Sequence, residues 1–277
     1  RHRVIVAWHQ GISQWLKIIF ALFFISYISS SSQVVMLGFA ISAIVVFLSQ
    51  FYFFYKNHML LLNKQNSVDK SLVDKYWFMK IVKYTIPFCI WGLFTWAQMA
   101  SDRWVLQKYQ SLSVVGMYMV IYQLGYYPVI FFTNIFLQFI SPILFTRAGS
   151  GSSIKRLSSV RQTTKKMVYS SLGFVLGMTI IAWITKDIII QLFAAQEYQS
   201  CVYLFPWMVL AGGLFATGQI CALDALNRGE PKILIWPKIT TAIIGIVLNF
   251  IGAIFWGISG VVFAQVFFSL FYLMWAF

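Results

Sequence analysis

Long uninterrupted apolar runs are the feature that most limits what this chain can fold into. Apolar residues make up 60% of the chain and charged residues only 10%, which is too apolar for one water-soluble core. A helix needs roughly 20 apolar residues to cross the ~30 Å hydrocarbon layer of a membrane, so we expect an all-α polytopic membrane protein with about eight transmembrane helices. The expected spans cover approximately Ser13 to Ile28, Val34 to Tyr55, Ile81 to Ser101, Val114 to Phe145, Val168 to Thr185, Cys201 to Leu226, Ile239 to Trp256 and Val261 to Phe277.

Basic residues predict the orientation of these spans, because lysine and arginine accumulate in cytoplasmic loops. Of the 21 basic residues, all but Arg103, Lys108 and Lys186 lie in alternate gaps between the spans or at Lys17. We therefore expect the first residue to be cytoplasmic and Asp102 to lie at the external end of the third span. The net charge of +14 is mostly a signal of topology. Since the charges are distributed over separate loops, no nucleic-acid partner is expected.

One long polar connector divides the chain. It runs from Lys56 to Lys80 and contains KNHMLLLNKQNSVDKSLVDK. The pattern predicts two spans in residues 1–55, a cytoplasmic linker in 56–80 and six spans in 81–277. The fourth of the eight expected spans is too long for one straight crossing, so we expect it to tilt, to bend near Pro128 or to continue past the membrane surface.

Two stripes of polar residues follow helical spacing inside the expected spans. Positions 3, 4 and 7 apart share one helix face, and polar side chains in hydrocarbon should face protein or a watery cavity. The stripes could therefore form interhelical hydrogen bonds or line a transport cavity, and both readings stay open. The residues are Trp91, Thr95, Gln98 and Asp102 in the third span, and Gln123, Tyr127, Asn134 and Gln138 in the fourth.

Three charged residues near span ends are further candidates. Asp102 and Arg103 either form an interfacial pair that ends a helix or act on a ligand. In the second reading Arg103 attracts an anion, and Asp102 orients it or exchanges a proton. Lys17 lies about one turn inside the first span, so it either extends to the cytoplasmic surface or contacts a phosphate.

Residues for catalysis or metal binding are scarce. The spans contain no histidine and almost no carboxylate, whereas a membrane enzyme needs paired acid and base groups or an activated nucleophile. The histidines lack the close spacing of a metal site, and the three cysteines sit inside apolar runs. We expect no enzyme, no metal and no cofactor.

Several stretches together resemble one transporter family. From Trp96 the chain reads WAQMASDRWVLQKYQSLSVVGMYMVIYQLG, and later LFAAQEYQSCVYLFPWMVLAGGLFATG and ALDALNRGEPKILIWPKITTAIIGIVLNFIGAIFWGISGVVFAQ. The shared patterns are DR, VGxY, EY and glycine-rich turns. In order and spacing these stretches resemble the polysaccharide-transport branch of the multidrug/oligosaccharidyl-lipid/polysaccharide exporter superfamily, typified by O-antigen flippases.

The resemblance implies a two-lobed flippase with six helices in each lobe and a central cavity that opens alternately to each side. This chain would supply the last two helices of the first lobe (1–55), the linker (56–80) and the whole second lobe (81–277), with about four spans upstream. The implied substrate is an undecaprenyl-pyrophosphate-linked oligosaccharide of O-antigen, capsule or exopolysaccharide, carried across a bacterial inner membrane. Implied partners are this lipid-linked oligosaccharide, membrane lipids and other polysaccharide-assembly membrane proteins.

A second transporter reading remains open. The same superfamily contains cation-coupled multidrug-type antiporters, which an acidic cluster in the first-lobe helices would favour. No GxxxxGK[ST] nucleotide motif is present, so we expect no ATP hydrolysis by this chain.

Overall fold

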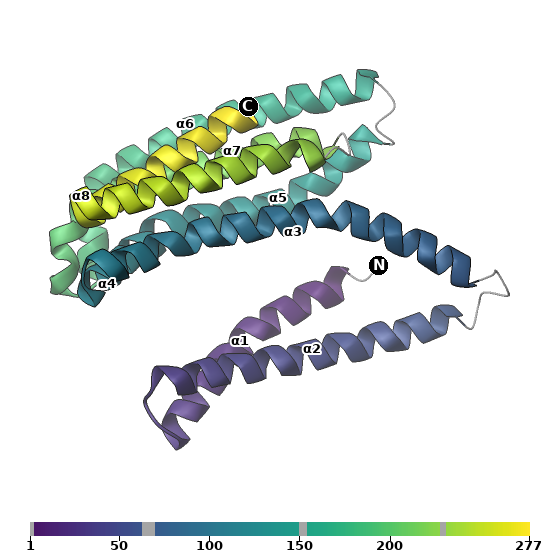
Figure 1. Ribbon diagram of the computed structural model, residues 1–277, viewed down its shortest axis with the longest axis horizontal. Helices are drawn as coiled ribbons and strands as arrows, with labels where there is room; N and C mark the ends of the chain where they lie inside the picture. The colour runs from purple at the N-terminus through teal and green to yellow at the C-terminus, as the bar shows by residue number, and fades with distance from the viewer. Residues whose placement is uncertain (1–2, 63–69, 150–153, 228–230) are drawn as a thin grey trace. The chain divides into compact units, whose positions relative to one another are not determined.

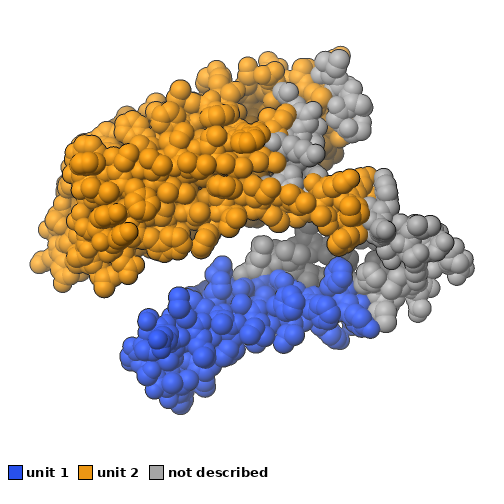
Figure 2. All heavy atoms as spheres, viewed as in Figure 1, with its two compact units in different colours: residues 1–76 blue, residues 77–277 orange. Residues whose placement is uncertain are grey.

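All regular secondary structure in the described part of the chain is helical. The structure is a computed structural model that describes residues 3–62, 70–149, 154–227 and 231–277. It divides into two compact units, residues 1–76 and 77–277 (Figure 2). The division falls inside the segment expected to be a linker, and each unit is described by itself.

The first unit contains a hairpin of α1 (Arg3–Tyr27) and α2 (Ser32–Leu62) (Figure 1). Near their connection the helices approach closely, since a Cβ added to Gly38 would lie 3.0 Å from the Ala21 backbone nitrogen. Toward the other end, His9 Nε2 lies 3.0 Å from Ser49 Oγ. Small residues at one end and a polar contact at the other are the usual means of pairing helices in lipid.

The second unit is a helical bundle centred on α7. This helix contacts α5, α6, α8 and η1, and 78% of its most apolar stretch is buried. Figure 1 shows α6, α7 and α8 running beside one another. The elements are α3 (Lys70–Tyr109, whose first residues belong to the first unit), α4 (Leu112–Ile121), η1 (Tyr122–Tyr126), α5 (Tyr127–Ala148), α6 (Ile154–Phe193), η2 (Gln196–Leu204), α7 (Phe205–Asn227), η3 (Pro231–Leu234) and α8 (Ile235–Ala276).

An irregular turn interrupts the long fourth segment. Ser111 caps the start of α4 by accepting a hydrogen bond from the Val114 backbone N–H at 3.3 Å. The helix then widens into the π-helical turn η1, immediately before Pro128 in the first turn of α5. Proline has no N–H to donate to the carbonyl of Leu124, four residues earlier, which accounts for the irregular turn at this point.

The last helical element, α8, is two helices that meet at Gly257. Its φ of 57° and ψ of −133° are non-helical, a backbone conformation that glycine adopts at little cost. The expected spans Ile239 to Trp256 and Val261 to Phe277 fall on either side of this break. On the two sides of this break the halves pack backbone against backbone, with Gly252 against Gly260.

Replacing Gly260 with alanine should destabilise the second unit. The new Cβ would overlap the Gly252 carbonyl group and lie 2.7 Å from the Gly252 Cα, and backbone on both sides cannot easily retreat. We expect Gly260→Ala to lower the free energy of unfolding by about 1–3 kcal/mol, the usual cost of overpacking. Titration with sodium dodecyl sulfate in mixed micelles measures this loss. Gly173→Ala is the matched control because no atom lies within 4 Å of its added Cβ, so its helix should be slightly stabilised, and equal effects would contradict the close contact.

Five helical segments of the described chain are long and apolar enough to cross a membrane. They also expose many large apolar side chains, such as Phe132 (69%) and Phe255 (71%), as a multi-pass membrane protein does toward lipid. In α1 the apolar stretch is shorter, and in α3 the polar side chains of the third expected span lower the mean hydropathy. The five segments are Ser32–Lys56, Leu112–Ala148, Lys155–Phe193, Gln196–Asn227 and Ile235–Ala276.

Candidate functional site

The Asp102 carboxylate is fully buried at the junction of α3, α4 and α8. Its Oδ2 accepts hydrogen bonds from Tyr118 Oη at 2.6 Å and from Gln265 Nε2 at 3.2 Å. Its Oδ1 accepts the backbone N–H of Arg103 at 2.6 Å. Three hydrogen-bond donors thus surround one carboxylate. Through Tyr118 and Gln265, α4 and α8 make polar contacts with α3 that lipid cannot provide.

The network extends from Asp102 to both halves of α8. Gln98 Nε2 donates to Gln265 Oε1 at 3.0 Å, and both side chains are buried. Ser101 Oγ donates to the Gln98 backbone carbonyl at 2.7 Å and accepts from Asn249 Nδ2 at 2.9 Å. Within the described chain, the remaining Asn249 oxygen has no hydrogen-bond partner. We call these residues, Gln98, Ser101, Asp102, Tyr118, Asn249 and Gln265, the Asp102 network.

Arg103 lies at the edge of this network. Its Nε is 3.9 Å from Asp102 Oδ1, its guanidinium carbon is 5.5 Å from the centre of the Tyr122 ring, and 42% of its side chain is exposed. The reading of Asp102 and Arg103 as a pair that ends a helix is wrong, because α3 continues to Tyr109. Just after the end of α3, Gln110 Nε2 donates a hydrogen bond to the Ala253 carbonyl of α8 at 3.2 Å.

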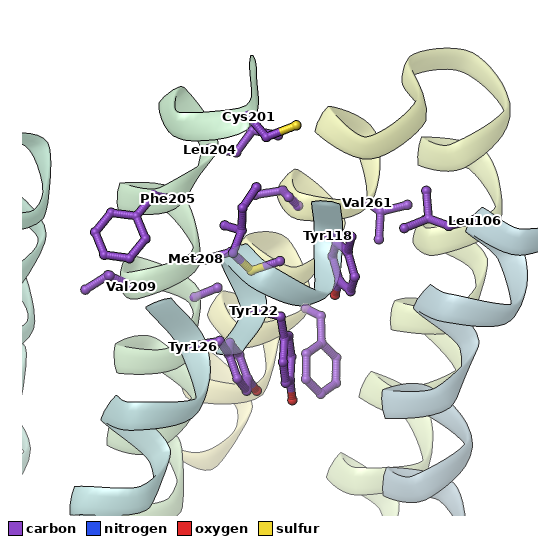
Figure 3. Packing of buried hydrophobic residues seen from close by; sticks show 14 of the residues in the cluster. Leu106, Tyr118, Tyr122, Tyr126, Cys201, Leu204, Phe205, Met208, Val209 and Val261 are labelled. Atoms are coloured by element: carbon purple, nitrogen blue, oxygen red, sulfur yellow. The ribbon is translucent and has the colours of Figure 1, made fainter. Parts of the chain in front are cut away.

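A column of three buried tyrosines runs down α4 and η1 from the Asp102 network. The rings of Tyr122 and Tyr126 stack with centres 4.8 Å apart, and those of Tyr118 and Tyr122 lie 6.0 Å apart (Figure 3). The column packs against α7 because Gly125 admits a close approach, its added Cβ lying 3.0 Å from Met208 Cβ. These three tyrosines are not members of the polar stripe expected in the fourth span, although their spacing of four marks one helix face.

A second buried polar group, Lys238, lies in the first half of α8. Its side chain is only 3% exposed, and aromatic rings from three helices surround its amine. Nζ lies 3.8 Å from the ring centre of Tyr272, 4.6 Å from that of Trp91 and 5.2 Å from that of Phe215. We call this arrangement the lysine cage. Ring faces attract a cation, and the attraction is strongest where water is excluded.

One side-chain amide lies against the lysine amine. Gln219 Oε1 lies 3.5 Å from Nζ and accepts a hydrogen bond from Tyr272 Oη at 3.1 Å. No carboxylate oxygen of the described residues is within 4.0 Å of Nζ. Within the described residues, the amine in the cage is therefore buried and has no acidic partner. An anion or another oxygen acceptor would satisfy this amine.

Sequence reasoning assigned Lys238 to a cytoplasmic loop, since it follows the polar stretch around Arg228. The structure instead buries it inside the bundle. The sequence contains one indication of this burial: Lys238 and Asn249 are 11 residues apart, so Lys238 shares a helix face with another polar residue of an apolar span. In the structure both residues are buried.

The structure places the two polar stripes in different surroundings. In the third span, Gln98 and Asp102 belong to the Asp102 network, Trp91 contacts the lysine cage and Thr95 is half-buried between them. In the fourth, the four stripe residues lie on an exposed face. They are Gln123, Tyr127, Asn134 and Gln138.

The exposed stripe and the buried tyrosine column lie on neighbouring faces of one segment. Gln123 and Tyr127 directly follow Tyr122 and Tyr126 in the sequence, and the tyrosine face is the one that packs against α7. In the first unit, Lys17 is half-buried and is the fifteenth of 25 residues in α1, a helix that begins before the expected span.

Comparison with known proteins finds no matching family model, no matching curated protein and no matching solved structure. Among the residues that the structure describes, no group of three His, Cys, Asp or Glu side chains could hold a metal ion. The Asp102 network and the lysine cage are the two buried polar sites that could serve a function.

The Gln98 to Gln265 contact should be a measurable link between α3 and α8. We expect a double-mutant cycle of Gln98→Leu and Gln265→Leu to give a coupling energy of about 0.6 kcal/mol and not above ~1.7 kcal/mol, the range for interhelical hydrogen bonds in membrane proteins. Unfolding in mixed micelles measures the four free energies. The pair Gln98→Leu and Gln138→Leu is the control, since Gln138 is exposed on another helix, and its coupling should be near zero.

Proposed function

We propose that this chain belongs to a flippase that carries undecaprenyl-pyrophosphate-linked oligosaccharides across a bacterial inner membrane for cell-surface polysaccharide synthesis. The single observation that carries the proposal is the lysine cage. A buried amine that lacks a described acidic partner favours an anionic ligand, and the pyrophosphate of the lipid-linked sugar is such a ligand. The sequence resemblance to O-antigen flippases points to the same substrate class.

Both polar sites have a role in this proposal. When the second lobe opens, the amine of Lys238 exchanges its aromatic rings for phosphate oxygens, while the rings and the nearby amide of Gln219 contact sugar. The isoprenoid tail stays in lipid, because hydrocarbon solvates it without cost. The Asp102 network joins α3 to both halves of α8, so these helices move together as the lobes rock.

The topology of the proposed flippase follows from the distribution of basic residues. In it the chain crosses the membrane eight times, with its first residue cytoplasmic, as two helices of one lobe and six of the other. Lys238 then lies toward the cytoplasmic side, where the substrate is loaded, and Asp102 toward the external side.

A cation-coupled antiporter is the second candidate, and the Asp102 network is the observation that favours it. A buried carboxylate contacted by a tyrosine hydroxyl and an amide can take up a proton as the transporter cycles. In this reading the transported molecule would be a cationic amphiphile.

Competitive binding to the purified full-length protein distinguishes the two candidates. We expect a polyprenyl-pyrophosphate oligosaccharide to be retained in native mass spectra and not to be displaced by tetraphenylphosphonium, a cationic amphiphile. Retention of tetraphenylphosphonium alone would contradict the flippase and support the antiporter.

A further inference from the structure

A groove of about 660 Å³ runs between α5 and α6 over the surface of α7. It lies apart from both polar sites described above. Bulky apolar side chains form its walls, among them Phe132 and Phe136 from α5 and Phe174 and Met178 from α6. Phe132 and Phe174 are 69% and 65% exposed, so these rings offer an open apolar surface.

The groove changes character along its length. Thr163, Lys166, Ser170 and Ser171 line the part nearer the start of α6, whereas the lining beyond Ser171 on α6 is apolar. From Thr163 to Met178 the groove follows α6 for roughly 22 Å at 1.5 Å per residue, more than the ~15 Å depth of one hydrocarbon leaflet. One polar end and one apolar end match the shape of a single lipid.

Lys166 is the basic side chain in the lining of the polar end, and the sequence before it is rich in basic residues. Between Arg147 near the end of α5 and Lys166 in α6 the sequence contains six basic residues and no acidic residue. Of the carboxylates in the described chain, Asp224 comes near this cluster, 3.9 Å from Arg161, and Asp224 is not part of the groove lining. The charge therefore complements an anionic headgroup.

We propose that the groove binds one anionic phospholipid, with an acyl chain along Phe132, Phe136 and Phe174 and its phosphate at Lys166. The hydroxyl group of Ser170 borders the same end and supplies a hydrogen-bond donor to a phosphate oxygen, whereas the Thr163 hydroxyl donates to the Ser159 backbone carbonyl at 3.0 Å. This site is separate from substrate transport and does not depend on the flippase proposal.

Native mass spectrometry of the full-length protein tests this assignment with equal amounts of phosphatidylglycerol and phosphatidylethanolamine. We expect phosphatidylglycerol to be retained about fivefold more, the factor for one basic residue beside an anionic lipid. Lys166→Gln should abolish the preference, and Lys165→Gln, which is adjacent but outside the groove, should preserve it. Equal retention of both lipids by the wild type, or an unchanged preference in Lys166→Gln, would overturn the proposal.

Filling the groove gives an independent arm of the test. Ser170→Trp should lower retention of both lipids, whereas Ser158→Trp, on an exposed part of α6 outside the groove, should not. An added polyprenyl-pyrophosphate oligosaccharide should leave phosphatidylglycerol bound. Displacement by that compound would assign the groove to a substrate tail and overturn the phospholipid assignment.

Discussion

Lys238→Met is expected to remove most transport activity while leaving the protein at least as stable as the wild type. Methionine keeps the length and most of the volume of the side chain but has no charge to offer a phosphate. Since a hydrogen bond to a charged group contributes about 1.5–3 kcal/mol, we expect the rate of substrate exchange to fall between about 10-fold and 100-fold. Replacing a buried ion by an apolar side chain is commonly neutral or stabilising by up to ~4 kcal/mol.

Two measurements on the same preparation check this expectation, the exchange rate in vesicles and the free energy of unfolding in mixed micelles. Lys165→Met is the control, because it removes an exposed lysine from α6 and should change neither quantity. A loss of stability above ~2 kcal/mol in Lys238→Met would show that the lysine cage serves the fold. Full activity in that variant would contradict its role in binding an anion.

Asp102→Ala is expected to cause the largest loss of stability among single substitutions in the Asp102 network. It leaves the Tyr118 hydroxyl without its acceptor and removes one acceptor of the Gln265 amide, both in the buried interior. An unsatisfied buried donor costs about 1–3 kcal/mol, so we expect a loss of about 3 kcal/mol in the free energy of unfolding. Asp102→Asn keeps an acceptor oxygen and should lose less.

Asp187→Ala is the matched control for this loss. Asp187 is exposed in α6, and its removal should change the free energy of unfolding by less than ~0.5 kcal/mol. Equal effects of the two alanine substitutions would mean that the network contributes nothing to stability.

The α3 side of the candidate site could be predicted from the sequence. The spacing of Trp91, Gln98 and Asp102 predicted a shared helix face, and the structure places all three in or beside the two polar sites. The partners of these residues could not be predicted. Gln265 lies 163 residues from Asp102 along the chain, and helical periodicity contains no information on which helices pack together.

The sequence also does not say which face of a span is buried. In the fourth segment Tyr122 and Tyr126 are buried and the adjacent Gln123 and Tyr127 are exposed, because the tyrosine face is the one that packs against α7. Lys238 was read as a loop residue because charge counting assigns a lysine near a span end to the surface. Its burial depends on Trp91, Phe215 and Tyr272, which come from three helices.

We propose that the protein moves a pyrophosphate-linked lipid between the leaflets of the membrane. Leaflet exchange of a labelled polyprenyl-pyrophosphate oligosaccharide, measured in vesicles that contain the full-length protein, tests it most directly. We predict exchange well above that of protein-free vesicles, and a much slower rate with Lys238→Met than with Lys165→Met. Exchange no faster than in protein-free vesicles, with the protein verifiably folded, would contradict the claim.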